Sequence, residues 1–158
     1  RSRVIEMTEA DFWTIIKRSR RNTNGDRKKQ ESNLRRELHK LTPDQLVEFD
    51  EWFGGFIRAA YHWDLWGAAF VVGGGCSDDG FWDFRSWLDA PNSRWLNFLN
   101  PAMFVWGEKL GKDEMELHEF PSTIGSNLGE EPDGEEFSDA KEDLKARYPK
   151  LWKKFGWR

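Results

Sequence analysis

The sequence predicts an all-α fold, a compact single-domain bundle of roughly six to eight helices with a long acidic surface loop. Apolar residues recur at helical spacing in several windows, and helix-start signals precede them. No stretch before residue 100 alternates apolar and polar residues for long enough to predict a strand. We expect an N-terminal extension at 1–7 and one helical domain at 8–158, with the acidic loop at 111–137 and a C-terminal docking helix at 138–158.

The first two helices have clear boundaries. Thr8 can cap the first helix, and Asp11 three positions later completes a short capping box. The polar run around Asn24-Gly25 ends that helix. The residues expected on the inner faces of the two helices are Phe12, Ile15, Ile16 and Ser19, followed by Leu34, Leu38 and Leu41.

A third helix starts at Thr42, because Pro43 suits the first helical position and Gln45 can complete a second capping box. Its predicted buried face carries Leu46, Phe49, Phe53, Phe56, Ile57 and Ala60.

The stretch from Tyr61 to Leu88 predicts a helix, a glycine hinge and a second helix. Residues 64–72 are almost all apolar, so we expect them to be almost wholly buried. The glycines at 73–75 should end that helix, because glycine adopts left-handed backbone angles easily. Ser77 or Asp78 can cap the next helix, whose predicted buried face carries Phe81, Phe84 and Leu88.

The remainder of the chain predicts shorter elements. We expect a short helix with Trp95, Phe98 and Leu99 and another starting at Asn100-Pro101. Within the acidic loop, one helical turn is expected near 114–118. The last helix starts near Ser138 and is interrupted by Pro149, and the tail docks through Leu151, Trp152 and Phe155.

Charge is distributed in blocks. Residues 1–40 carry a net charge of +6, 41–107 of −6, 108–140 of −9 and 141–158 of +5. This pattern predicts electrostatic contact between the parts, or a basic surface for a partner. The basic run at 17–29 lacks interleaved aromatic residues and lies in an acidic chain, so a solvated face is favoured over nucleic-acid contact.

Compartment signals are few. The single cysteine excludes an internal disulfide and is compatible with a cytoplasmic location. No signal peptide is recognisable, and no apolar run is long enough to cross a bilayer.

Eight residues of the central stretch form a candidate ligand site, each with a structural alternative. The tryptophans can line an aromatic cleft or pack a core. The two adjacent aspartates can contact a ligand or metal, or cap a helix and pair with the arginine. The cysteine precedes a helix start, but the neighbouring acids favour a neutral thiol over a reactive thiolate. The set is Trp63, Asp64, Trp66, Cys76, Ser77, Asp78, Asp79 and Arg85.

Four segments resemble a bacterial family catalogued as domain of unknown function 4240. They are TEADFW at 8–13, YHWDLWGAA at 61–69, GGCSDDGFWDFRSWL at 74–88 and ARYPKLWKKFG at 146–156. The family pattern favours Asn at position 73 and Gly at position 86, where this chain has Gly73 and Ser86. The resemblance implies a small cytoplasmic bacterial protein. It implies no particular activity, because none is established for the family.

Two classes of function follow from these residues. The favoured one is a non-enzymatic binding or regulatory module that uses the aromatic and acidic cleft at 63–88 for a protein or small-molecule partner. The alternative is a small metal- or carboxylate-dependent enzyme, hydrolase- or transferase-like, acting through Asp78 and Asp79. No Ser-His-Asp order, HExxH, P-loop or paired CxxC supports the alternative. No catalytic residue, metal or cofactor is assigned.

Overall fold

The computed structural model describes residues 6–89, 101–111 and 131–157, without the side chains at 86–89, 101, 103 and 104. The described residues form helices and no strand, which confirms the all-α prediction. The helices are α1 (Glu9–Ser19), α2 (Arg27–Leu38), α3 (Pro43–Ala59), α4 (Trp63–Gly73), α5 (Asp78–Asp89), α7 (Pro101–Leu110), α9 (Lys141–Arg147) and α10 (Pro149–Phe155). No helix among the described residues is both long enough and apolar enough to cross a membrane.

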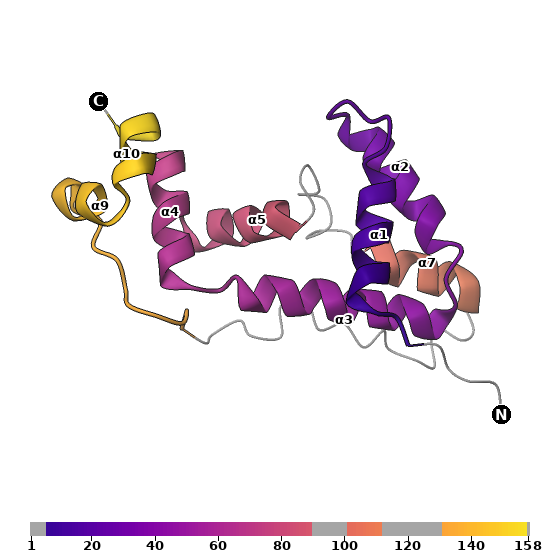
Figure 1. Ribbon diagram of the computed structural model, residues 1–158. Coiled ribbons are helices and arrows are strands. Elements are labelled where there is room, and N and C mark those ends of the chain that lie inside the picture. The colour runs from indigo at the N-terminus through magenta and orange to yellow at the C-terminus, as the bar shows by residue number, and fades with distance from the viewer. Residues whose placement is uncertain (1–5, 90–100, 112–130, 158) are drawn as a thin grey trace.

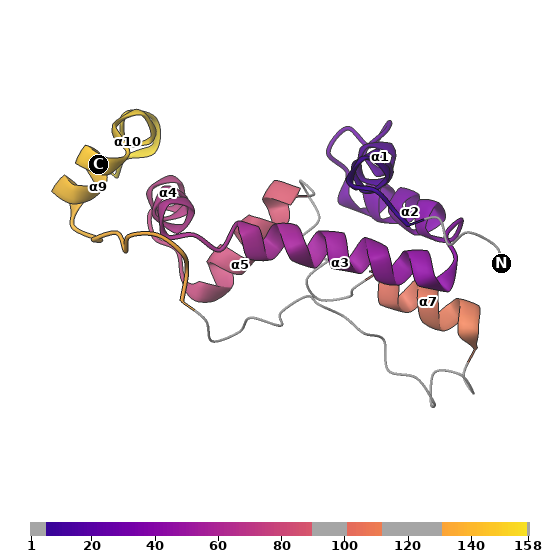
Figure 2. The same ribbon diagram turned by 60° about the horizontal axis from the view of Figure 1, so that its bottom comes forward.

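The long helix α3 organises the molecule. At one end α1 and α7 pack against α3, and α2 packs against both α1 and α7 (Figure 1). At the other end α5 runs back beside α3, α4 contacts α5, and α10 joins α4 to α9 (Figure 2). The chain therefore has a first group of helices (α1, α2, α7) and a second group (α4, α5, α9, α10) along one shared helix.

The predicted starts of the first and third helices are confirmed, and α9 starts at Lys141, slightly after the predicted Ser138. The Thr8 hydroxyl accepts the Asp11 N–H at 3.2 Å while the Asp11 carboxylate accepts the Thr8 N–H at 2.9 Å. Thr42 and Gln45 make the same reciprocal pair at the start of α3. Both capping boxes satisfy N–H groups that the first helical turn leaves without partners.

The main core lies between the first group and α3. Phe12 is fully buried and its ring centroid lies 5.0 Å from that of Phe49. Met7, which the sequence assigns to the N-terminal extension, is also buried, and its carbonyl accepts the Trp52 indole N–H at 2.9 Å. The folded part therefore includes this residue. The rest of the core comprises Ile15, Ile16, Leu34, Leu38, Leu46, Phe53, Ile57, Ala102, Val105 and Trp106.

The prediction that residues 64–72 are almost wholly buried is wrong. Within α4 only Gly67, Ala69 and Val71 are buried, and Val72 is 41% exposed. The reason is that α4 lies outside the main core and packs against α10 and α5, so part of its surface faces solvent. Its apolar residues instead form a smaller aromatic cluster in the second group.

The end of the predicted acidic loop is docked. Asp133 forms an isolated bridge to His62: its N–H donates to the Tyr61 carbonyl at 3.1 Å and its carbonyl accepts the Trp63 N–H at 2.8 Å. Residues 131–137 are mostly exposed, as expected for a surface loop, but they are held against the second group. The predicted short helix at 95–99 and the predicted turn at 114–118 lie outside the described residues.

The C-terminal segment packs onto the second group through a different aromatic residue from the one predicted. Pro149 separates two short helices as predicted, and Leu151 and Trp152 are partly buried. Phe155, however, is 40% exposed, so its predicted docking role is wrong. The chain turns at Gly156, and the Trp157 ring instead packs against Phe70 at 5.6 Å between centroids.

Candidate ligand-binding site

A ladder of aromatic rings runs through the second group. Trp63 and Trp66 stack at 5.2 Å with an interplanar angle of 8°, and Trp66 and Phe81 stack at 5.0 Å and 9°. Phe81 continues to Tyr61 at 6.1 Å. The Arg85 guanidinium lies 4.5 Å from the centre of the Tyr61 ring. Because these residues come from the α3–α4 junction, α4 and α5, the ladder holds those elements together.

The glycine hinge sets the angle between α4 and α5. Gly74 and Gly75 have φ of +67° and +129°, backbone conformations that favour glycine. The Gly75 N–H donates to the Phe70 carbonyl at 2.8 Å and closes the end of α4. The Trp66 indole N–H then donates to the Cys76 carbonyl at 2.9 Å, which ties the ladder to the hinge.

Beside the ladder lies a hollow of about 410 Å³, here named the aromatic hollow. Its described lining residues combine aromatic rings with two carboxylates and include no Lys or Arg. They are Trp63, Trp66, Phe70, Cys76, Glu136, Phe137, Ser138 and Asp139. Three of the predicted site residues, Trp63, Trp66 and Cys76, are therefore brought together.

The second wall of the hollow was missed by sequence reasoning. Phe137 lies 5.4 Å from Phe70 and 6.0 Å from Trp63, measured between ring centroids. It is the one aromatic residue within the acidic run at 131–139, which is the only signal that could have suggested a docking role. That run contains five acids and no base, so its net charge of −5 lies beside the rings.

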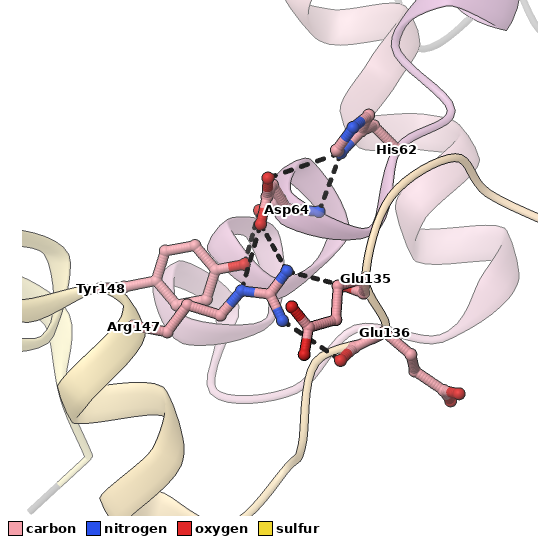
Figure 3. Close-up of polar contacts among 6 residues, drawn as sticks. All are labelled: His62, Asp64, Glu135, Glu136, Arg147 and Tyr148. Atoms are coloured by element: carbon pink, nitrogen blue, oxygen red, sulfur yellow. Dashed lines mark hydrogen bonds and ion pairs between the residues drawn. The ribbon is translucent and has the colours of Figure 1, made fainter.

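A polar clamp holds this wall in place (Figure 3). Arg147 donates from Nε to the Asp64 carboxylate at 3.1 Å and also contacts it through Nη2. The same guanidinium donates to the carbonyls of Glu135 at 2.6 Å and Glu136 at 3.2 Å. The Tyr148 hydroxyl donates to the Asp64 carbonyl at 2.8 Å. One arginine thus joins α4, α9 and the strip that carries Phe137.

The clamp has an electrostatic signature. Hydrogen bonds from Arg147 hold the pKa of the Asp64 carboxyl below its ordinary value of about 4. A carboxyl whose pKa is lower in the folded protein than in the unfolded chain stabilises the fold. This stabilisation is fully present above the unfolded-state pKa and is lost as the pH falls through the folded-state pKa. The clamp is therefore intact at neutral pH and weakens only in acid.

Cys76 is a neutral thiol at neutral pH. Partial burial raises its pKa, and the nearby negative charge of Asp78 raises it further. Its position in the hollow therefore supplies a small, weakly polar surface rather than a nucleophile.

The other predicted site residues lie elsewhere. The Ser77 hydroxyl accepts the Gly80 N–H at 3.2 Å and so caps α5. Asp78 and Asp79 are exposed in the first turn, and neither makes a side-chain hydrogen bond or ion pair within the described residues. Arg85 is buried and donates to the Ile57 carbonyl at 2.9 Å. Among the described residues neither acid pairs with it, so the alternative in which the two acids pair with this arginine is not observed.

The distance along α5 explains this result. Arg85 lies six to seven residues after the two acids, about two helical turns away, and the ladder draws it inward. In the part of the chain that the structure describes, no three His, Cys, Asp or Glu side chains gather to hold a metal ion.

Asp78→Asn and Asp79→Asn are each expected to change the free energy of unfolding by less than about 1 kcal/mol. Ser77 already caps the helix, and only the attraction between acid and helix dipole is lost. Paired melting curves with and without divalent metals measure this. A metal-dependent stabilisation of the wild type that Asp79→Asn abolishes would contradict a purely solvent-facing role and favour the carboxylate-dependent enzyme.

A family model described as "Protein of unknown function (DUF4240)" matches residues 7–91, more than half of the chain. The chain belongs to the DUF4240 family. The match covers α1 to α5 and one wall of the aromatic hollow, whereas Phe137, the clamp arginine and the motif at 146–156 lie beyond it. Neither a curated protein nor a solved structure matches the chain.

Proposed function

We propose that this DUF4240 protein is a non-enzymatic binding module whose aromatic hollow takes a small organic cation, of the alkylated ammonium class. The observation that carries the proposal is the composition of the lining: four aromatic side chains, two carboxylates and no basic residue among the described ones. Aromatic faces and carboxylates both attract a cation, and alkyl groups on nitrogen match apolar walls.

The size of the hollow supports a small ligand. A volume of about 410 Å³ lies near the lower end of ligand pockets, which span roughly 300–1,000 Å³. The clamp and the hinge form this hollow before any ligand arrives, so little ordering is required on binding. The cytoplasmic location that the family resemblance implies is part of the same proposal.

Physical magnitudes predict a modest affinity. A cation–π contact contributes about 0.5–2 kcal/mol, and a solvent-facing ion pair contributes about 0.2–1 kcal/mol. Four cation–π contacts and two ion pairs total at most about 10 kcal/mol, and an association cost of at least about 4 kcal/mol leaves at most about 6 kcal/mol, so the expected Kd is no tighter than roughly 0.05 mM.

Calorimetric titration with choline and with dimethylbutanol, its uncharged carbon analogue, tests the proposal. Choline is expected to bind at least tenfold more tightly than the analogue, because only the charge differs (about 1.4 kcal/mol per factor of ten). The double variant Glu136→Gln, Asp139→Asn is expected to lower the choline affinity by about fivefold.

The matched control removes two acids away from the hollow. Glu142→Gln with Asp143→Asn deletes the same charge from exposed positions of α9. Equal binding of choline and its analogue would contradict the proposal, as would an equal loss of affinity in the two double variants.

A further inference from the structure

The first group of helices carries a second hollow, at the opposite end of α3 from α4 and the aromatic ladder (Figure 1). It measures about 690 Å³, lies between α1 and α2, and is here named the basic hollow. Its charged lining residues are Arg18, Arg21, Lys29, Arg36, Lys40 and Glu37, a net charge of +4.

The basic hollow is supported by a packed scaffold. The Asn33 amide donates to the Ser19 and Arg21 carbonyls, each at 3.1 Å, and so pins the turn between the helices. Leu34 and Leu38 are buried behind it. Arg18, Lys29 and Arg36 therefore project from two helices whose spacing is set by the core. Arg21 and Lys40 lie in the turns that follow these helices.

Ion pairs and hydrogen bonds within the basic hollow hold three of its basic side chains in place. Glu37 accepts from Lys40 at 2.6 Å and lies 3.6 Å from Arg18. The hydrogen bond from Lys40 lowers the pKa of Glu37, so this acid stays ionised and holds both cations near the hollow. Arg36 donates to the Asn33 side chain at 3.1 Å. One acid against five bases leaves a strong positive excess.

We propose that the basic hollow binds a small soluble anion that carries two or more linked phosphate groups. Arginine guanidinium groups match phosphate oxygens in a planar, two-point geometry, and three of the five bases here are arginines. The lining adds two neutral polar side chains, Asn22 and Ser32, whereas the Asn33 amide is already used within the scaffold. Several phosphates on one ligand engage several of these groups together.

The residues lining the basic hollow favour a small polyphosphate over nucleic acid or an anionic membrane surface. The lining contains no aromatic side chain on which a nucleic-acid base could stack. A membrane surface would need apolar side chains for insertion, but the large apolar residues exposed among the described ones, Val72 and Phe155, lie in the second group. A concave site of this volume suits a small molecule.

Calorimetric titration of the full chain with inorganic tripolyphosphate tests the proposal, with sulfate, a single-stranded oligonucleotide and vesicles bearing phosphoinositide headgroups as the other arms. Tripolyphosphate is expected to bind at least tenfold more tightly than sulfate and to weaken as salt is raised. Arg21→Gln with Arg36→Gln is expected to weaken tripolyphosphate binding at least thirtyfold.

The control variant is Lys141→Gln with Lys145→Gln, which removes the same charge from exposed positions of α9. It is expected to bind tripolyphosphate within twofold of the wild type, and melting curves check that both variants fold. Equal losses in the two variants, or no preference over sulfate, would overturn the proposal. Tighter binding of the oligonucleotide or the vesicles than of tripolyphosphate would assign the surface to that partner and overturn it as well.

Discussion

Replacing Trp66 by alanine is expected to lower the free energy of unfolding by about 2–3 kcal/mol and to remove choline binding. Trp66 is the middle rung of the ladder, stacked on Trp63 and Phe81, and its N–H donates to the hinge carbonyl of Cys76. The expected cost is below that of a fully buried tryptophan because the side chain is partly exposed. Chemical denaturation and calorimetry measure the two effects.

Trp52 provides the matched control for this change. It is also partly buried, donates one hydrogen bond to a backbone carbonyl and stacks on one neighbouring ring, Phe56. Trp52→Ala is expected to lower stability by a similar amount, about 2–3 kcal/mol, while choline binding is retained. Choline binding that survives in Trp66→Ala at a temperature where the variant is folded would exclude the aromatic hollow as the site.

Gly67→Ala is expected to destabilise the second group by about 1–3 kcal/mol and to weaken choline binding. A methyl group at this position would lie 2.2 Å from the Tyr148 hydroxyl oxygen and 2.8 Å from the ring carbon that carries it. The tyrosine would have to move, which breaks its hydrogen bond to Asp64 and shifts the adjacent clamp residue Arg147. Thermal melting and calorimetry record the two effects.

Gly73→Ala is the control in the same helix, because a methyl group there meets no atom within 4 Å. It is expected to leave stability within about 0.5 kcal/mol of the wild type or to raise it slightly, since alanine favours helix. If both substitutions were equally harmless, the contact between α4 and Tyr148 would not hold the second group together.

Local signals in the sequence determined the helices of this protein. Thr8 with Asp11 and Thr42 with Gln45 satisfy the free N–H groups of a first turn across three residues, and helical spacing places Phe12 and Leu34 in the core. The hinge glycines could also be predicted from the sequence, because a positive φ is a local conformational preference of glycine itself.

Only the tertiary structure decided the site. The aromatic hollow needs Phe137 beside Trp63, and the clamp joins Asp64 to Arg147 across 83 positions of the chain. Helical and strand periodicity relates only residues that are close in sequence. Residues so far apart come into contact only in the complete tertiary fold.

The same physics explains where the structure differs from the sequence-based expectations. Arg85 turned inward to the Ile57 carbonyl and the Tyr61 ring rather than to the adjacent acids, because α3 and the ladder offered buried partners. The apolar run at 64–72 stayed half exposed because few helices cover α4. Apolar residues show that burying the helix is favourable. How much of its surface is buried depends on how many neighbouring elements the assembled fold places against it.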